Sequence, residues 1–323
     1  MIIKFFRYSY QIELFTIIIV GALFWLWGFN MGAPPLPAME AAPLSNLLLD
    51  LPQNWITSVS ALALLLIESF MISAITGRFK ILRLTNLLPS LVYVLLMSFN
   101  QNLLTLTPSL VSNFFVIILF YYLFELYSAE NTFFFTFNTS LAIGITMLLV
   151  PENAILLLLV WVTFVIYRSY GLREWIISLT GILVTGIFTI SIFYLNNNLQ
   201  ELFNSYTIYF SNFKPGYPKI STEYLPFIIV IGFLTLITVP RMAFKLDENI
   251  IRSRKRLNIV IFAILISLGI LFINPSFWEY TISALFIPLS ITISRLIISI
   301  KKERNKDWVL LLIIIAIALE RIL

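Results

Sequence analysis

Residues 57–76 read TSVSALALLLIESFMISAIT, a run of twenty residues in which Glu68 is the one ionisable side chain. An α-helix of this length is about 30 Å long, which is the thickness of the hydrocarbon core of a typical bilayer. We therefore expect a membrane-spanning helix at 57–76.

The rest of the chain has the same character. It has 323 residues, of which 60% are apolar and 11% charged, whereas a soluble domain carries about 25% charged residues. Ten further apolar runs are candidate spans, at 11–29, 84–100, 109–127, 132–150, 153–168, 174–196, 224–240, 257–273, 279–299 and 308–320. The predicted fold class is all-α, a polytopic transmembrane helical bundle of about 11 spans. We expect residues 1–323 to form a single integral membrane domain with no soluble domain.

The basic residues predict the orientation of these spans. If the N-terminus is cytoplasmic and the spans alternate, 18 of the 21 lysines and arginines fall on the cytoplasmic side. The opposite side receives Lys214, Lys219 and Arg321. The C-terminus is then extracytoplasmic. Lys4 and Arg7 before the first run also resemble a signal peptide, but the length of that run favours a retained helix.

Several classes of function are excluded by what the chain lacks. It contains no cysteine and no histidine, which excludes disulfides, thiol chemistry and histidine proton relays. It has no GxxxxGK[ST] loop and no GxGxxG after a strand, so we expect no ATP hydrolysis by the chain itself. The basic run RSRKR at 252–256 is interpreted as a topological signal; the alternative is a patch for lipid headgroups or nucleic acid. We predict no nucleic-acid partner and no evident cofactor.

Two amphipathic helices are predicted on the outer face. Leu44, Leu47, Leu48 and Leu51 follow helical spacing in the first outer loop. In the later outer loop, residues 198–213 place aromatic and leucine side chains on one face, opposite Asn204 and other polar residues. Such helices lie in the membrane interface. Trp25, Trp55 and Trp278 fall near the same boundary, as expected for an aromatic belt.

Three acidic residues are the candidate catalytic residues: Glu40, Asp50 and Glu68. Glu68 lies deep in its span, where an unpaired charge costs several kcal/mol. It is either a proton-carrying or substrate-contacting group, or a structural residue hydrogen-bonded to another helix.

Glu40 and Asp50 share the first outer loop, and the same face receives Glu152, Glu201, Glu223 and Glu279. Carboxylates there can hold a divalent cation or act as a general base. The alternative for all six is that they are solvated loop residues.

The layout resembles an uncharacterised family of bacterial polytopic inner-membrane proteins. The cues are FRYSY at 6–10, REW at 173–175 and IPLSI at 287–291. This resemblance implies a location in the bacterial inner (cytoplasmic) membrane and brings no known activity. The run LAIGITMLLVP at 141–151 and the apolar run after it are also similar to the central helices of C-type membrane glycosyltransferases and related lipid-linked sugar polymerases. That similarity implies catalytic acids in the first outer loop, at Glu40 and Asp50.

Three functions remain open. The first is an envelope-biogenesis protein that handles a lipid-linked substrate at the outer leaflet, with membrane lipids and a polyprenyl-linked substrate as partners. The second is a proton-coupled transporter or flippase that uses Glu68. The third is a non-catalytic subunit bound to other membrane proteins in a larger complex.

Overall fold

The computed structural model describes residues 10–31, 44–45, 48, 54–82, 86–100, 103–168, 171–212, 214–244, 251–300 and 302–322. Within these ranges the chain forms twelve α-helices and no strand. Their bounds are α2 Tyr10–Met31, α4 Trp55–Arg78, α5 Leu88–Met97, α6 Pro108–Glu125, α7 Thr132–Leu149, α8 Leu156–Tyr167, α9 Leu172–Leu195, α10 Leu199–Asn212, α11 Leu225–Phe244, α12 Ile251–Ile270, α13 Trp278–Ser299 and α14 Glu303–Ile322. Three 3-10 turns precede α8, α11 and α13, at Pro151–Ile155, Thr222–Tyr224 and Pro275–Phe277.

The all-α prediction is confirmed, and each of the predicted apolar runs contains a helix. Six helices are long and apolar enough to cross a membrane: α4, α6, α7, α9, α11 and α13. The helix within 84–100 is shorter than expected, because it begins at Leu88 with Pro89 in its first turn and ends at Met97. The total of about 11 spans and the direction of the termini stay predictions.

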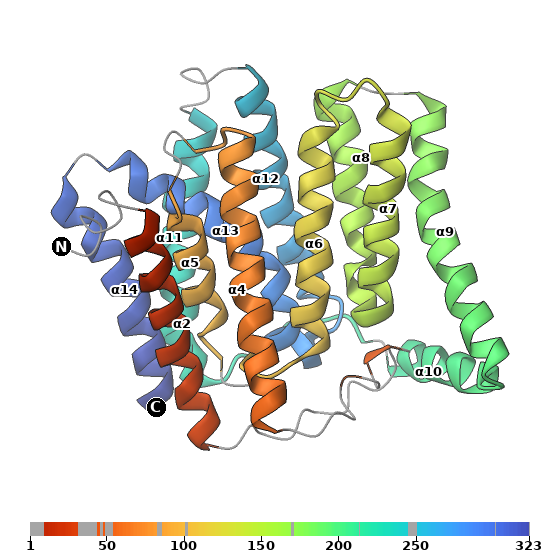
Figure 1. Cartoon of the computed structure of the whole chain (residues 1–323), viewed down its shortest axis with the longest axis horizontal. Coiled ribbons are helices and arrows are strands. Elements are labelled where there is room, and N and C mark those ends of the chain that lie inside the picture. Colours follow the sequence, from red (N-terminus) through yellow and green to blue (C-terminus); the bar gives the residue numbers. More distant parts are fainter. Residues whose placement is uncertain are drawn as a thin grey trace.

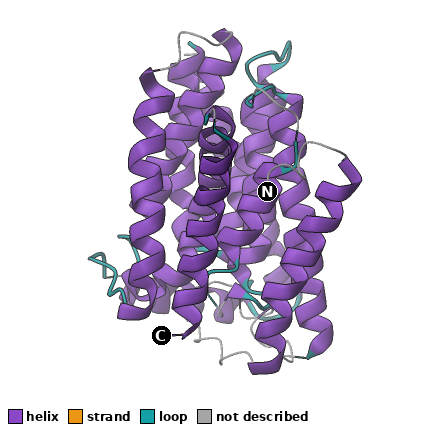
Figure 2. Ribbon diagram, turned by 90° about the vertical axis from the view of Figure 1, so that its left-hand side faces the viewer, coloured by secondary structure: helices purple, strands orange, loops and turns teal. Residues whose placement is uncertain are grey.

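The helices run up and down side by side, and α10 lies across one end of them (Figure 1). We call this end, where α4 and α13 begin and α14 ends, the α10 end, and the other the opposite end. A view turned by 90° shows the same upright packing (Figure 2). α13 packs against α4, α5, α6, α11, α12 and α14, whereas α9 stands at the edge and packs mainly on α7.

The contact between α7 and α9 depends on two glycines. A Cβ atom added to Gly181 of α9 would lie 2.6 Å from the backbone nitrogen of Leu141 and 2.8 Å from the carbonyl oxygen of Phe137. A Cβ atom at Gly144 of α7 would collide with the side chain of Thr185. Small residues therefore let the two backbones approach closely, as is common between membrane helices.

Arginine side chains bind backbone carbonyls at the opposite end. Arg256 of α12, a member of the RSRKR run, is 7% exposed and donates hydrogen bonds to the carbonyl oxygens of Phe124 and Phe79. Arg295 of α13 donates to the carbonyl oxygen of Ile81 at 2.8 Å. The last carbonyls of a helix have no partner within the helix, so these side chains satisfy groups just after α4 and at the end of α6.

The tryptophans only partly match the expected belt. Trp55 is 73% exposed, but Trp25 and Trp278 are buried against other helices. The belt interpretation is therefore wrong for Trp25 and Trp278, because neighbouring helices cover the positions that we expected to meet the interface.

Candidate functional site

Glu68 faces the inside of the bundle and is fully buried. Its Oε2 atom accepts a hydrogen bond from the hydroxyl of Tyr93 on α5 at 2.7 Å. The amide of Asn113 on α6 donates to the same hydroxyl at 3.4 Å, and Ser283 of α13 donates to Oδ1 of Asn113 at 3.4 Å. A chain of polar side chains therefore links α4, α5, α6 and α13. This confirms the expectation that Glu68 would lie beside polar groups of another span.

The second carboxylate oxygen of Glu68 forms no well-aligned hydrogen bond among the described residues, although the backbone amide of Phe114 lies close enough to act on the carboxylate. The partner of the first oxygen is a hydroxyl and not a cation, so no lysine or arginine neutralises this group directly. A carboxyl in such surroundings is able to hold or release a proton, but it has no obvious ligand to bind. Both interpretations of Glu68, functional and structural, fit this geometry.

A second group of polar side chains lies next to Glu68, between α4 and α5, and its role is structural. The hydroxyls of Ser73 and Ser90 lie 2.6 Å apart, and Ser90 also donates to the carbonyl oxygen of Ser69 at 2.6 Å. All three serines are buried between α4 and α5. Hydrogen bonds of this kind stabilise contacts between membrane helices, and we assign this group to packing.

Several acidic side chains of the described residues lie at the α10 end, around Glu279 in the first turn of α13. Asn100 donates to Oε2 of Glu279 at 3.0 Å. The hydroxyl of Tyr224 also hydrogen-bonds to Glu279 and is close enough to Glu223 and Glu320 for both to act on it electrostatically. We call Asn100, Glu223, Tyr224, Glu279 and Glu320 the outer acidic cluster.

Arg321 is the positive charge beside this cluster. It follows Glu320 at the end of α14 and donates to the carbonyl oxygens of Ser98 and Phe24 at 3.2 and 3.1 Å. Its guanidinium lies 5.3 Å from the centre of the Phe24 ring. Arg321 thus connects the end of α14 to α2 and to the residue after α5, and it does so next to the acids.

Glu152 marks a second polar contact at the α10 end. It is 3% exposed, and its Oε1 atom accepts a hydrogen bond from Asn274 at 2.9 Å. Tyr209 of α10 interacts with the same carboxylate; burial, and then the charge of Glu152, raise the pKa of Tyr209 and keep its hydroxyl protonated. This contact helps to hold α10 on the bundle. The structure contradicts a solvated-loop interpretation for Glu152, because other segments cover it.

The helix expected at 198–213 is present as α10. Leu202 is buried and Asn204 is exposed, as the pattern predicts, but Ser205 from the expected polar face is buried. The rings of Phe203 and Phe210 are 55% and 69% exposed. Both rings are therefore on the side of α10 that the bundle leaves uncovered. A membrane interface on that side would cover them.

The other candidate residues fall in three groups. Glu40 and Asp50 lie outside the described residues. Between them, the backbone nitrogen of Leu44 donates to the carbonyl oxygen of Leu148 at the end of α7, at 3.3 Å. Glu201 and Glu223 are exposed. Glu320 was missed, although a Glu-Arg pair that closes an apolar run is a signal that sequence reasoning can use.

No group of three or more acidic side chains arranged to hold a metal ion occurs in the described part of the chain. The divalent cation expected at outer-face carboxylates therefore stays a prediction.

Comparison with protein-family models, with curated protein sequences and with solved structures finds no match. Both resemblances inferred from the sequence remain predictions for that reason. The functional argument therefore rests on the geometry of the two sites described above, the buried Glu68 network and the outer acidic cluster.

Proposed function

We propose that this chain is an integral membrane protein of the bacterial inner membrane that handles a lipid-linked substrate at the outer leaflet, in envelope biogenesis. In this proposal the outer acidic cluster receives the polar part of the substrate. The helix α10 lies in the membrane interface at the same end of the bundle, on the side of α9.

One observation carries the proposal: Glu279 is held at the end of the bundle by two neutral donors, the amide of Asn100 and the hydroxyl of Tyr224. Neutral donors fix the direction of the carboxylate without neutralising its charge. A carboxylate held in this way, at the level where lipid headgroups begin, is suited to accept a proton from the hydroxyl of an acceptor molecule. That is the chemistry of glycosyl transfer from a lipid-linked donor, in keeping with the resemblance to C-type glycosyltransferases.

The test compares lipid-linked intermediates in the native host. We expect a strain that lacks the protein to accumulate a polyprenyl-linked species, measured by mass spectrometry of organic extracts. The wild-type chain should restore the normal pool and Glu279→Gln should not, because the amide keeps the shape of the side chain but cannot accept the proton. Glu201→Gln, on the exposed face of α10, is the matched control and should restore it. A pool that does not respond to deletion of the protein contradicts the proposal.

The burial of Glu68 favours a second function, proton-coupled transport. Its Oε2 atom is hydrogen-bonded to the neutral hydroxyl of Tyr93, and no ion pair of Glu68 with a lysine or arginine is found among the described residues. A carrier must gain and lose a proton during each cycle. A purely structural Glu68 would keep one protonation state throughout.

Infrared difference spectra between wild type and Glu68→Gln separate the two roles of Glu68. We expect a carrier to show a carboxyl band that converts to a carboxylate band as the pH is raised. A band that stays the same at every pH at which the protein remains folded rules out the carrier and leaves the structural role. In that case Gln should be tolerated at position 68 and Leu should not.

A further inference from the structure

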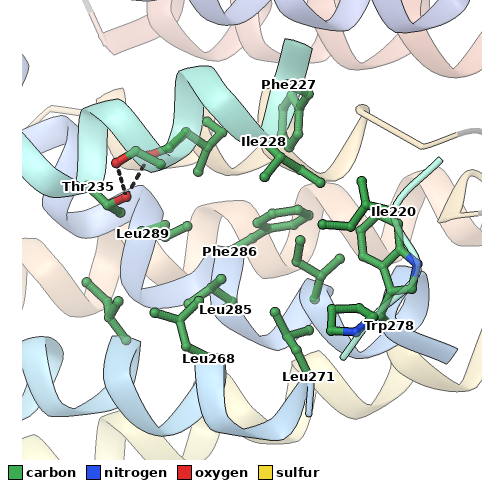
Figure 3. A pocket seen from close by; sticks show the side chains of 15 residues that line it. Ile220, Phe227, Ile228, Thr235, Leu268, Leu271, Trp278, Leu285, Phe286 and Leu289 are labelled. Carbon is green, nitrogen blue, oxygen red and sulfur yellow. Dashed lines mark hydrogen bonds between the residues drawn. The ribbon is translucent and has the colours of Figure 1, made fainter. Parts of the chain in front are cut away.

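An apolar cavity of about 150 Å³ lies between α11, α12 and α13 (Figure 3). Its walls are aliphatic and aromatic, and the main polar atoms near it are the hydroxyl of Thr235 and the indole nitrogen of Trp278. Thr235 already donates to carbonyl oxygens of its own helix, at Ile231 and Gly232. The indole nitrogen of Trp278 is a single polar partner, fewer than the two to four that a buried water needs, so the cavity is suited to an apolar occupant.

The cavity is open on one side, between α11 and α12. Its floor is α13, where Leu285, Phe286 and Leu289 are buried. Leu268 on the α12 rim is 39% exposed, and Gly232 on the α11 rim is partly exposed. α11 is one of the helices apolar enough to cross a membrane, so the opening faces the region that the bilayer would occupy.

Stacked aromatic rings keep one wall in place. Phe227 of α11 stacks on Phe99 with ring centres 4.5 Å apart, and Phe286 meets Phe99 edge-on at 5.4 Å. All three rings are buried. Rings that are locked together in this way do not easily move into the empty space, so the cavity is preformed.

The cavity lies in the half of the bundle nearest the α10 end. On α11 it extends from Phe227 to Thr235, which corresponds to about 12 Å along the helix axis. Trp278 lines the part of the cavity nearest the α10 end, and the next residue is Glu279 of the outer acidic cluster. The apolar cavity and the cluster are thus adjacent through two consecutive residues.

A lysine lies at the same end. Lys219 is exposed and stands between Pro218 and Ile220, which both line the cavity. This segment is held against the end of α12 by a hydrogen bond from the backbone nitrogen of Gly216 to the carbonyl oxygen of Phe272, at 3.0 Å. The ring of Tyr217 also contacts that of Phe272, with centres 6.0 Å apart. The backbone of Lys219 therefore lies beside the cavity, at the end nearest α10, and its basic side chain is exposed there.

We propose that the cavity binds the headgroup-proximal part of the hydrocarbon chain of a polyprenyl phosphate, with the phosphate at Lys219. This inference rests on the proposed function, because it assigns a binding site to the lipid of that substrate. An apolar cavity of about 150 Å³ takes up a molecule the size of benzene, so a segment of roughly six carbon atoms fits here. The remainder of the chain leaves between α11 and α12 into the bilayer.

The test uses the full chain reconstituted in vesicles of neutral lipid. The probe is a polyprenyl phosphate with a photoreactive diazirine in its first isoprene units, and the matched probe is the corresponding polyprenol without phosphate. We expect cross-links to peptides of α11 and α12, about fivefold stronger for the phosphate, which is the ratio for the ~1 kcal/mol that one lysine contributes near an anionic headgroup. Lys219→Gln should remove this difference, and Lys214→Gln, five residues earlier, should retain it.

Gly232→Phe places a ring at the cavity rim and should lower the cross-linking of both the polyprenyl phosphate and the polyprenol. A Cβ atom at Gly232 meets no other atom within 4 Å, so the variant should fold. The matched control is Gly186→Phe on α9, which also has open space around it. Equal cross-linking in the two variants, or cross-links spread over the other helices, would overturn the site.

A third probe separates the possible sources of the chain. Phosphatidylglycerol with a diazirine in its acyl chain should give weaker labelling of α11 and α12 than the polyprenyl phosphate. Equal labelling would overturn the assignment to a polyprenyl lipid. The Glu279→Gln experiment is independent of all three probes, so failure of the cavity and failure of the proposed function produce different results.

Discussion

α9 and α13 are similar in sequence character but opposite in environment. Both are apolar helices long enough to cross a membrane, yet 22% of the apolar window in α9 is buried, against 89% in α13. In α13 every residue from Tyr280 to Ser294 is buried, including Ser283, Ser290 and Thr292. In α9 the large apolar side chains point outward, and Leu183, Ile187 and Phe188 are each more than 60% exposed.

The buried face of α9 consists of small residues. Its buried residues are Ser178, Gly181, Thr185 and Thr189, spaced three or four apart, and Gly181 and Thr185 meet α7 directly. Lipid tails are as apolar as leucine, so hydrophobicity alone does not drive two helices together inside a bilayer, and close packing does. In α9, therefore, side-chain size rather than apolar character decides which face is buried.

The largest effect is expected at the closest approach of α9. Gly181→Leu should prevent α9 from packing on α7, because the added side chain would occupy the positions of backbone atoms that cannot move aside. Even Gly181→Ala should cost about 3 kcal/mol of unfolding free energy. Thermal unfolding of the purified protein measures the loss. Gly186→Ala, in open space on the same helix, should instead be neutral or stabilise by up to about 1 kcal/mol; equal losses at the two glycines would break the comparison.

The same substitution at two isoleucines tests the comparison directly. Ile287 of α13 is 1% exposed and Ile187 of α9 is 63% exposed. Ile287→Ala should cost about 2–5 kcal/mol, because it leaves a cavity in a packed core. Ile187→Ala should cost less than about 1 kcal/mol, because lipid fills the space. Denaturant unfolding in mixed micelles measures both. A loss at Ile187 as large as that at Ile287 would show that α9 has a further protein neighbour.

The polar network beside α13 should show a smaller effect. Glu68→Leu removes the acceptor of the Tyr93 hydroxyl and leaves that hydroxyl buried without this partner, at a cost of about 1–3 kcal/mol. Glu68→Gln keeps an oxygen that can accept the same hydrogen bond, and should stay within about 1 kcal/mol of wild type. Unfolding of the two variants side by side is the measurement. If the Glu68→Leu variant were as stable as Glu68→Gln, the hydrogen bond from Tyr93 would contribute nothing to the free energy of unfolding.

The smallest effect concerns α10. Phe210→Asp should weaken the docking of α10 by about 1 kcal/mol and leave the bundle folded, because the ring is 69% exposed to the surroundings expected to be the membrane interface. A cysteine introduced at exposed Ser211 should then react faster with a water-soluble maleimide, since the chain has no other cysteine. Asn204→Asp, on the exposed polar face, is the control and should leave that rate unchanged.

Much of the fold could be predicted from the residues alone. The apolar runs predict the helices, because the length of a run and its lack of charge are local properties. The spacing within 198–213 predicts α10, and the cost of burying a charge places Glu68 inside the bundle. Two of the three candidate catalytic residues, Glu40 and Asp50, lie outside the described residues, so their role stays a prediction.

The partners of these groups could not be predicted. Tyr93 and Asn113 meet Glu68 only because α5 and α6 lie beside α4, and no local pattern specifies that arrangement. The outer acidic cluster brings together Asn100, Tyr224, Glu279 and Glu320, which come from four separate segments.

The residues alone predict that the protein is built from helices and where each helix lies along the chain. Which helix is central and which stands at the edge follows from how the helices pack in the folded protein. The physical reason is that hydropathy is averaged around a helix and is nearly the same for α9 and α13, whereas packing depends on the size of single side chains on one face. Gly181 lies close to the backbone of α7 at Phe137 and Leu141. The sequence near Gly181 does not specify these neighbours, because they come from a separate helix.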